Sequence, residues 1–183
     1  MIDTKVAETR RLLCVAMALA PVTSFADLYD DYINSTSKHY FVSFLARKGS
    51  TTTVGHSFVG VGIQINETLR VYERLFGLYP ADGALAAVKS VFTKTSGKID
   101  RTWDDMTWDT ELFLSIDEAK RKLILAKFQE WSGNAPKYSL AGNGAINCSG
   151  LVAEVAKIAG LKVPSGAGTT RPWKYIEALK TAN

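Results

Sequence analysis

The sequence predicts an α+β domain. The prediction rests on strand-like runs, on helical periodicity, and on the order of the two along the chain. β-Branched and aromatic runs gather in the first half, near residues 39–47, 54–65 and 69–77, with turn residues between them. Helical periodicity dominates the second half, where apolar residues recur every three or four positions. Strands followed by helices favour an antiparallel sheet packed against helices.

Before the first strand, a short helix is expected near residues 27–33. After the third strand, residues 77–83 have turn chemistry. The next stretch is expected to hold a strand at 87–93, a turn at 95–97 and then a loop that carries Trp103 and Trp108.

A further strand is expected at residues 111–115. Ser115 and Glu118 have the spacing of a capping box, which opens a helix that runs through Trp131. The run Thr170-Arg171-Pro172-Trp173 begins a short C-terminal helix that is expected to end near Lys180.

Length and composition fit one compact domain over residues 27–183. The chain is 46% apolar and 22% charged, which is ordinary globular composition. The net charge of +4 is spread along the chain, with no basic block longer than Lys120-Arg121-Lys122. This pattern disfavours nucleic-acid binding. It is compatible with attraction to an anionic envelope polymer or lipid surface but does not demonstrate it.

The first 26 residues have the layout of a secretory signal peptide. Arg10 and Arg11 precede an apolar stretch over residues 12–20, and Ser24 and Ala26 provide small residues before the expected cleavage point. The alternative is an amphipathic N-terminal helix that stays on the folded protein. No segment approaches the roughly 18 consecutive apolar residues of a membrane span. We therefore expect an exported protein, periplasmic or secreted, without a transmembrane span.

Cys148 lies where a Gly-rich segment meets an apolar-periodic helix that ends at Gly160. A cysteine at a helix N-terminus lies beside unpaired backbone N–H groups and the positive end of the helix dipole. Both lower its pKa and favour the reactive thiolate. We therefore regard Cys148 as a candidate nucleophile. The alternative is a small buried hydrophobic residue.

The cysteine count favours the functional interpretation. Signal removal would take Cys14 away and leave Cys148 as a single thiol, so no intramolecular disulfide could form. A lone thiol in an oxidising compartment is a liability unless it has a use. One cysteine and the distant histidines His39 and His56 lack zinc-ligand spacing, so the sequence predicts no metal site and no cofactor.

The string Asn147-Cys148-Ser149-Gly150, with Tyr138 upstream and Pro164 beyond the helix, resembles the cysteine block of the NlpC/P60 cysteine peptidases. The likeness covers residues 138–164. It departs at Asn147, where the family usually has Asp. It also departs after Cys148, where ordinary members carry the catalytic histidine and this chain has none.

His56 supplies the missing base in this comparison. Gly55-His56 followed by an apolar, Gly-containing strand is similar to the histidine block of the same superfamily. The order of His56 before Cys148 resembles its circularly permuted branch, which includes YiiX-like and lecithin:retinol acyltransferase-like proteins. Such an order is harmless, because a nucleophile and its base need only be neighbours in space. The alternative for His56 is a strand histidine satisfied by local hydrogen bonds, and His39 is expected to be solvated at a strand end.

The resemblance implies a permuted papain-like fold, with an antiparallel sheet packed against the cysteine helix. A third polar residue usually orients the imidazole in such sites. Glu73 on the following strand is the leading candidate, with Tyr72 and Gln64 behind it. The strand register that would decide is open. The alternative for Glu73 is a surface carboxylate beside Arg74.

The function implied by the resemblance is an exported cysteine amidase or peptidase. The Cys148 thiolate would attack a carbonyl, backbone N–H groups at the helix start would hold the oxyanion, and water would release the thioester. The resemblance places Tyr138 near the active site, and we group Asn147 and Ser149 with it as oxyanion or substrate contacts. Asn147 shapes the loop at the helix start or simply caps the helix.

Two other functions remain open. The expected partner is a peptide or acyl substrate. Cell-wall peptide (peptidoglycan) is the family's usual substrate, but the chain has no wall-binding repeat. The first alternative is a thiol hydrolase or acyltransferase that acts on a lipid or acyl ester. The second is a non-catalytic secreted binding protein with a degenerate site. The sequence does not predict the oligomeric state.

Overall fold

The computed structural model of the chain describes residues 39–50, 54–65, 69–83, 89–100, 107–142 and 144–183. The expected signal peptide, the expected helix at 27–33 and Trp103 lie outside these residues. All the helices and strands named below belong to one compact unit, His39–Asn183.

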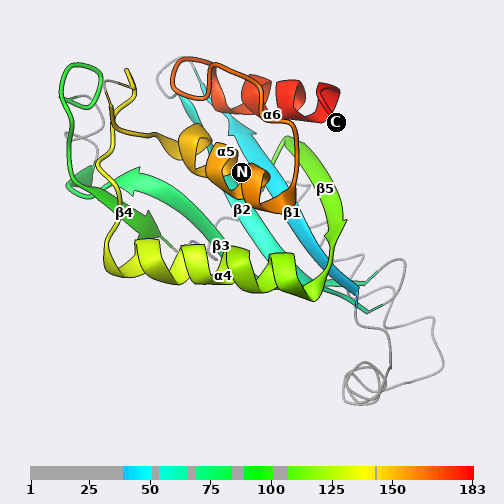
Figure 1. The fold of residues 1–183 in the computed structure, drawn as a ribbon. Helices are drawn as coiled ribbons and strands as arrows, with labels where there is room; N and C mark the ends of the chain where they lie inside the picture. Colours follow the sequence, from blue (N-terminus) through cyan, green and yellow to red (C-terminus); the bar gives the residue numbers. More distant parts are fainter. Residues whose placement is uncertain (1–38, 51–53, 66–68, 84–88, 101–106, 143) are drawn as a thin grey trace, which may run out of the picture. The chain divides into compact units, whose positions relative to one another are not determined.

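In the described part of the chain, the strands form one five-stranded antiparallel sheet (Figure 1). They are β1 (His39–Lys48), β2 (Gly55–Gln64), β3 (Arg70–Pro80), β4 (Gly97–Asp100) and β5 (Thr110–Ile116). Their order across the sheet is β4-β3-β2-β1-β5. Consecutive strands β1 to β4 are neighbours, whereas β5 crosses back to pair with β1.

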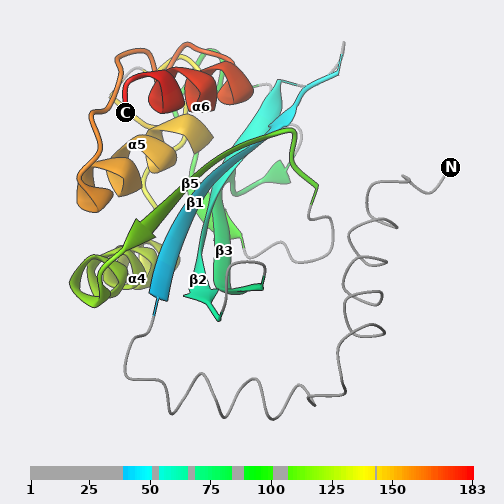
Figure 2. The ribbon, with the colours of Figure 1, turned by 90° about the vertical axis from the view of Figure 1, so that its right-hand side faces the viewer.

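Three helices cover one face of this sheet, as Figure 2 shows: α4 (Glu118–Gly133), α5 (Cys148–Ala159) and α6 (Pro172–Thr181). Helix α5 packs over β2 and β3, and α6 packs over β1 and β5. Helix α4 runs beside α5. The predicted α+β class and the packing of the cysteine helix on an antiparallel sheet are confirmed.

Side-chain alternation gives the sheet two apolar faces. The helix-covered face holds the larger cluster, to which β2 contributes Val59 and Val61 and α5 contributes Leu151 and Val155. The opposite face holds a smaller cluster of Leu45, Phe58 and Leu75, with Tyr72 and Trp108 packed against it. Because successive side chains of a strand point to opposite faces, each central strand is buried on both sides.

The predicted helix ends are correct where local chemistry sets them. Helix α5 ends at Gly160, which adopts the left-handed conformation with φ of 86°. Helix α6 begins at Pro172, where a missing N–H costs nothing. The predicted capping box is wrong. Ser115 stays in β5, and Asp117 caps α4 by accepting a hydrogen bond of 2.7 Å from the Lys120 N–H.

Residues 77–100 depart most from the prediction. Strand β3 continues to Pro80, because residues 77–80 pair with β4, which the sequence pattern did not indicate. No strand is found over the described residues of the expected strand at 87–93. Instead, the Phe92 and Thr93 N–H groups both donate to the Lys89 carbonyl oxygen at 2.9 Å, which forms a tight turn.

Candidate functional site

Cys148 is the first residue of α5, and its side chain is only 3% exposed. Asn147 caps the helix, since its Oδ1 accepts a hydrogen bond from the Gly150 N–H at 2.9 Å. The Asn147 Nδ2 donates to the Gly168 carbonyl oxygen at 3.3 Å. The Asn147 side chain therefore both caps the cysteine helix and ties it to the loop before α6.

The start of α5 is bonded to the start of β2. Ser149 and Ser57 are fully buried, and their Oγ atoms lie 3.2 Å apart in a hydrogen bond. Ser149 follows Cys148 and Ser57 follows His56, and consecutive Cα atoms are about 3.8 Å apart. The fold therefore brings the backbones of Cys148 and His56 close together, although they are far apart in sequence.

The His56 ring is packed among aromatic rings and backbone. It stacks on Tyr79 with centroids 4.1 Å apart and lies nearly parallel to Phe58 at 6.1 Å. Its Nε2 lies so close to Gly77 that a Cβ at that position would collide with it. Gly77 thus provides the space that the imidazole occupies, since any larger residue would displace the ring.

The electrostatic setting keeps His56 neutral. Burial lowers the pKa of His56 to about 3, with a further contribution from the positive charge of Arg47. Arg47 is the register partner of His56 on β1. The Nε2 atom is buried and has no hydrogen-bond partner in the described part of the chain. For this nitrogen, the alternative of a strand histidine satisfied by local hydrogen bonds does not hold.

The Nε2 of His56 makes no hydrogen bond to the Cys148 sulfur, since this nitrogen has no partner among the described residues. The strand geometry gives the reason. Ser57 points to α5, so its neighbour His56 points to the other face, where its ring stacks with Phe58. The structure therefore brings together the two segments that carry the predicted pair but leaves the two reactive side chains apart.

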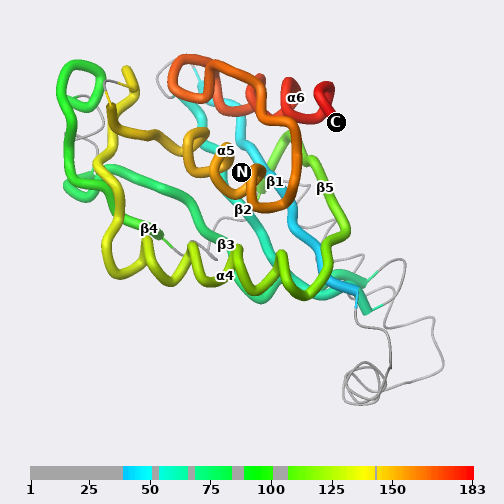
Figure 3. The backbone as a smooth tube through the Cα atoms, in the orientation of Figure 1, coloured from blue at the N-terminus to red at the C-terminus, as the bar shows by residue number. Residues whose placement is uncertain are grey.

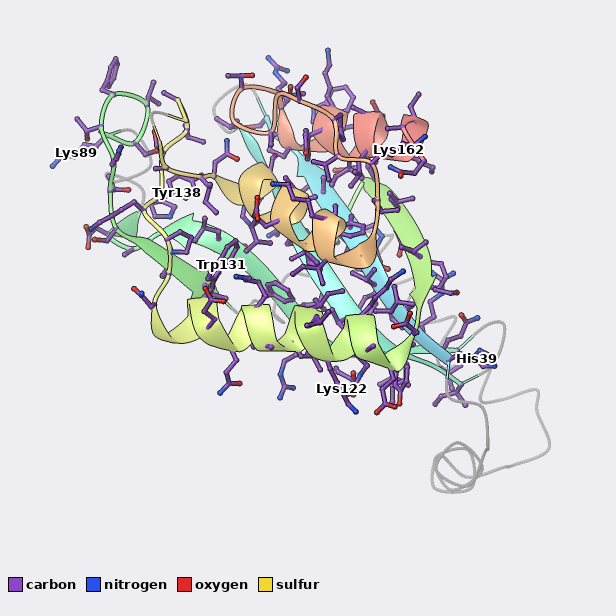
Figure 4. The ribbon with its side chains drawn as sticks, viewed as in Figure 1. His39, Lys89, Lys122, Trp131, Tyr138 and Lys162 are labelled. Carbon is purple, nitrogen blue, oxygen red and sulfur yellow. The ribbon has the colours of Figure 1, made fainter. Side chains whose placement is uncertain are left out.

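Tyr138 lies beside the start of α5, as Figure 4 shows, and its side chain is buried. The segment from α4 to α5, traced in Figure 3, is held there by β-bridges of Tyr138 with Thr95 and Ile146. Burial raises the Tyr138 pKa well above its usual value, and interactions with Cys148 and Tyr79 raise it further. Tyr138 is thus within electrostatic reach of both Cys148 and the ring that stacks on His56.

The structure does not bring Glu73 to His56. The Glu73 carboxylate accepts a hydrogen bond of 2.7 Å from the Arg121 Nε on α4 and forms an ion pair with the same guanidinium. It occupies the irregular position of β3, where the register with β2 shifts. The β3 residues that contact the His56 ring are Gly77 and Tyr79, which lie further along the strand than Glu73.

The other two candidates for a third residue are also placed elsewhere. Gln64 lies at the far end of β2, opposite His39 and Arg70. The Tyr72 hydroxyl donates to Ser43 at 3.4 Å, beside the Glu111 carboxylate. His39 is exposed at the start of β1, as expected.

Sequence reasoning missed Tyr79, the closest aromatic neighbour of His56. Only the pairing of β3 with β2 would have indicated Tyr79. The strand was predicted to end near residue 77, so Tyr79 lay outside it. Among all the residues that the structure describes, no group of three or more His, Cys, Asp or Glu side chains could hold a metal ion.

Within the described residues, every helix is too short or too polar to cross a membrane. No family model, curated protein or solved structure matches this chain.

Proposed function

We propose that the protein is a cysteine hydrolase with a permuted papain-like fold, in which Cys148 is the nucleophile and His56 is the base. One observation carries this proposal. The Ser57–Ser149 hydrogen bond fixes the N-terminus of the cysteine helix against the strand position next to His56, whose buried Nε2 has no partner among the described residues. A buried polar atom without a partner calls for an explanation, and a catalytic role is one.

The start of α5 suits the chemistry of acyl transfer. The first N–H groups of a helix have no partner within the helix, and Asn147 accepts those of Gly150, through its side chain, and Leu151, through its carbonyl oxygen. The N–H groups of Cys148 and Ser149 are therefore suited to hold an oxyanion next to the sulfur. Cys148 would attack the carbonyl, the thiol proton would pass to His56, and the leaving group would take that proton as the thioester forms. Water would then hydrolyse the thioester.

Ser57 faces α5 and His56 faces the opposite side of β2, so the proposal requires the His56 side chain to move around the start of the strand when substrate binds. This is a larger change than the shortening of a long catalytic hydrogen bond that substrate binding often causes. A neutral imidazole is the form that can accept a proton, but a pKa of about 3 makes His56 a weak base for a thiol. The proposal therefore also requires that the change on substrate binding raise the pKa of His56 toward its usual value.

The resemblance of residues 138–164 to the NlpC/P60 cysteine block favours an amide bond, with exported cell-wall peptide as the first substrate to test. A lipid or acyl ester is the alternative within the same chemistry. A non-catalytic secreted binding protein is the second candidate function. It is favoured by the burial of Cys148 and by the missing hydrogen bond to His56.

The first experiment measures how fast Cys148 reacts with iodoacetamide at pH 7, followed by mass spectrometry of the Cys148 peptide. An ordinary thiol is only a few per cent thiolate at this pH, so an activated Cys148 should react up to about 30-fold faster. His56→Gln should remove this advantage, whereas the matched variant His39→Gln should retain it. Slow labelling that is equal in all three proteins would support the non-catalytic candidate instead.

The second experiment separates the substrates once the pair is established. Purified sacculi and a panel of acyl esters are offered to the wild-type protein and to Cys148→Ala. Release of peptide fragments by the wild type alone would support the amidase, and ester cleavage without peptide release would support the acyl hydrolase.

A further inference from the structure

The turn that precedes β4 presents large apolar side chains to solvent. We call residues 89–94 the tip loop. Phe92 is 78% exposed and Val91 is 45% exposed. Single exposed apolar residues are common on protein surfaces, but a bare phenylalanine next to a valine at the end of a turn is a feature typical of interaction sites.

Hydrogen bonds hold the tip loop in this exposed position. The Lys89 carbonyl oxygen accepts from two N–H groups within the turn, as described above. Ser90 is fully buried, and its carbonyl oxygen accepts from the Leu140 N–H at 2.9 Å and the Ser139 hydroxyl at 3.1 Å. Ordering the apolar side chains on binding therefore requires little change in the backbone, which lowers the entropic cost of association.

The charged side chains within the tip loop are both positive. Lys89 and Lys94 are exposed, and residues 89–98 include no acidic residue. Within the part of the chain that the structure describes, neither lysine forms an ion pair.

Two basic residues of α4 differ in this respect. Lys122 pairs with Glu118 at 3.1 Å, and Lys127 pairs with Glu130 at 2.7 Å. The exposed Leu123 of α4 thus has ion-paired lysines on its helix, whereas Phe92 lies between two lysines that form no ion pair with any described residue.

We propose that the tip loop docks on the surface of a membrane that contains anionic lipids. Phe92 and Val91 would enter the boundary between headgroups and acyl chains, and Lys89 and Lys94 would contact lipid phosphates. A soluble polyanion would satisfy the lysines but would offer no apolar phase for the phenylalanine ring. The combination of both features therefore favours a lipid surface, and this inference does not depend on Cys148 being catalytic.

The docked orientation has a geometric consequence. The tip loop is bonded to Ser139 and Leu140, and the neighbouring Tyr138 interacts with Cys148. Figure 4 shows Lys89 and Tyr138 at the same end of the fold. A membrane bound at the tip loop would therefore lie on the side of the molecule where α5 begins.

The test is co-sedimentation of the full chain with lipid vesicles of two compositions, pure phosphatidylcholine and phosphatidylcholine with about one third phosphatidylglycerol. We expect binding to the anionic vesicles that weakens with added salt. Phe92→Ser should weaken it about tenfold. The double change Lys89→Gln with Lys94→Gln should weaken it about 25-fold, at roughly fivefold for each lysine.

The matched controls are Leu123→Ser and the double change Lys122→Gln with Lys127→Gln, which alter the same residue types on α4. They should change binding less than about twofold. These side chains are exposed except that of Lys127, which is half-buried, and thermal unfolding followed by circular dichroism will show whether each variant is folded.

Several outcomes would overturn the proposal. One is the absence of binding to anionic vesicles. Another is binding that survives both tip-loop changes, because the membrane affinity would then come from elsewhere, such as the apolar stretch at residues 12–20. Binding that depends on the lysines but not on Phe92 would indicate a simple polyanion contact and would also reject it.

Discussion

His56 is half-buried as a residue, and its buried ring nitrogen Nε2 has no hydrogen-bond partner in the described part of the chain. Leaving a buried polar atom without a hydrogen bond costs about 1–3 kcal/mol, a notable fraction of the stability of a small domain. Stacking on Tyr79 and Phe58 offsets part of this cost. Because the unpartnered nitrogen lowers the stability of the fold, a function for His56 explains its presence better than a structural role does.

The burial of His56 predicts how stability depends on pH. In the unfolded chain His56 takes up a proton near pH 6.5, whereas in the folded protein it does so only near pH 3. Between these values the unfolded state binds the extra proton, so the free energy of unfolding should fall by up to about 1.4 kcal/mol per pH unit as the pH drops from 6.5 toward 3. Urea titrations at pH 7, 6 and 5 measure this slope.

His56→Gln removes the titrating group and should flatten the slope in that range. His39→Gln is the matched control, because His39 is exposed, and it should leave the slope unchanged. If the two variants behave alike, His56 is not held neutral in the folded protein.

At this scale the sequence identified residues whose signals are local. The position of Cys148 at a helix start and the capping role of Asn147 follow from a few adjacent residues. The neighbours of His56 do not, because they depend on the register of β2 with β3. One bulge near Glu73 changes which β3 residues pair with β2, and no local sequence pattern predicts this bulge.

Helix α5 shows how an element's limits follow from its end residues. Asn147 begins it, Gly160 ends it, and most of its residues between are buried against β2 and β3. By contrast, β4 is a strand of only four residues with a single large apolar side chain, Ile99. Its pairing with β3 is a tertiary contact that four residues cannot encode on their own.

Gly160 permits a test of the α5 end. Its φ of 86° is strained for any residue with a Cβ, so Gly160→Ala should lower the free energy of unfolding by about 1 kcal/mol. Gly133→Ala is the matched change at the end of α4, where a Cβ meets no atom within 4 Å. It should be neutral or stabilise by up to about 1 kcal/mol. Chemical denaturation measures both, and an equal loss for the two would contradict the assigned helix end.

In the whole molecule, the larger apolar cluster joins the sheet to the three helices. Side chains from four of the strands and all three helices take part in it. The class of this architecture was predictable, because strand and helix periodicities are separated along the chain. The placement of β5 beside β1 was not, because it depends on a long connection and not on neighbouring residues.

Leu151→Ala tests the packing of α5 on the sheet. Leu151 is fully buried in the larger cluster, so truncation should cost about 2–5 kcal/mol. Leu123→Ala, at a 59% exposed position of α4, should change the free energy of unfolding by no more than about 0.5 kcal/mol. Similar small effects in both variants would mean that α5 is not packed on the sheet as described.

The crossing of β5 back to β1 has a consequence for synthesis. Strand β1 contains a run of six buried residues, and its second partner follows about seventy residues later. At a translation rate of about 5–20 residues per second, one side of β1 waits roughly 4–14 seconds for that partner to be made. Throughout this interval the nascent chain offers an apolar strand edge, which is the kind of segment that chaperones bind and that self-associates when none is present.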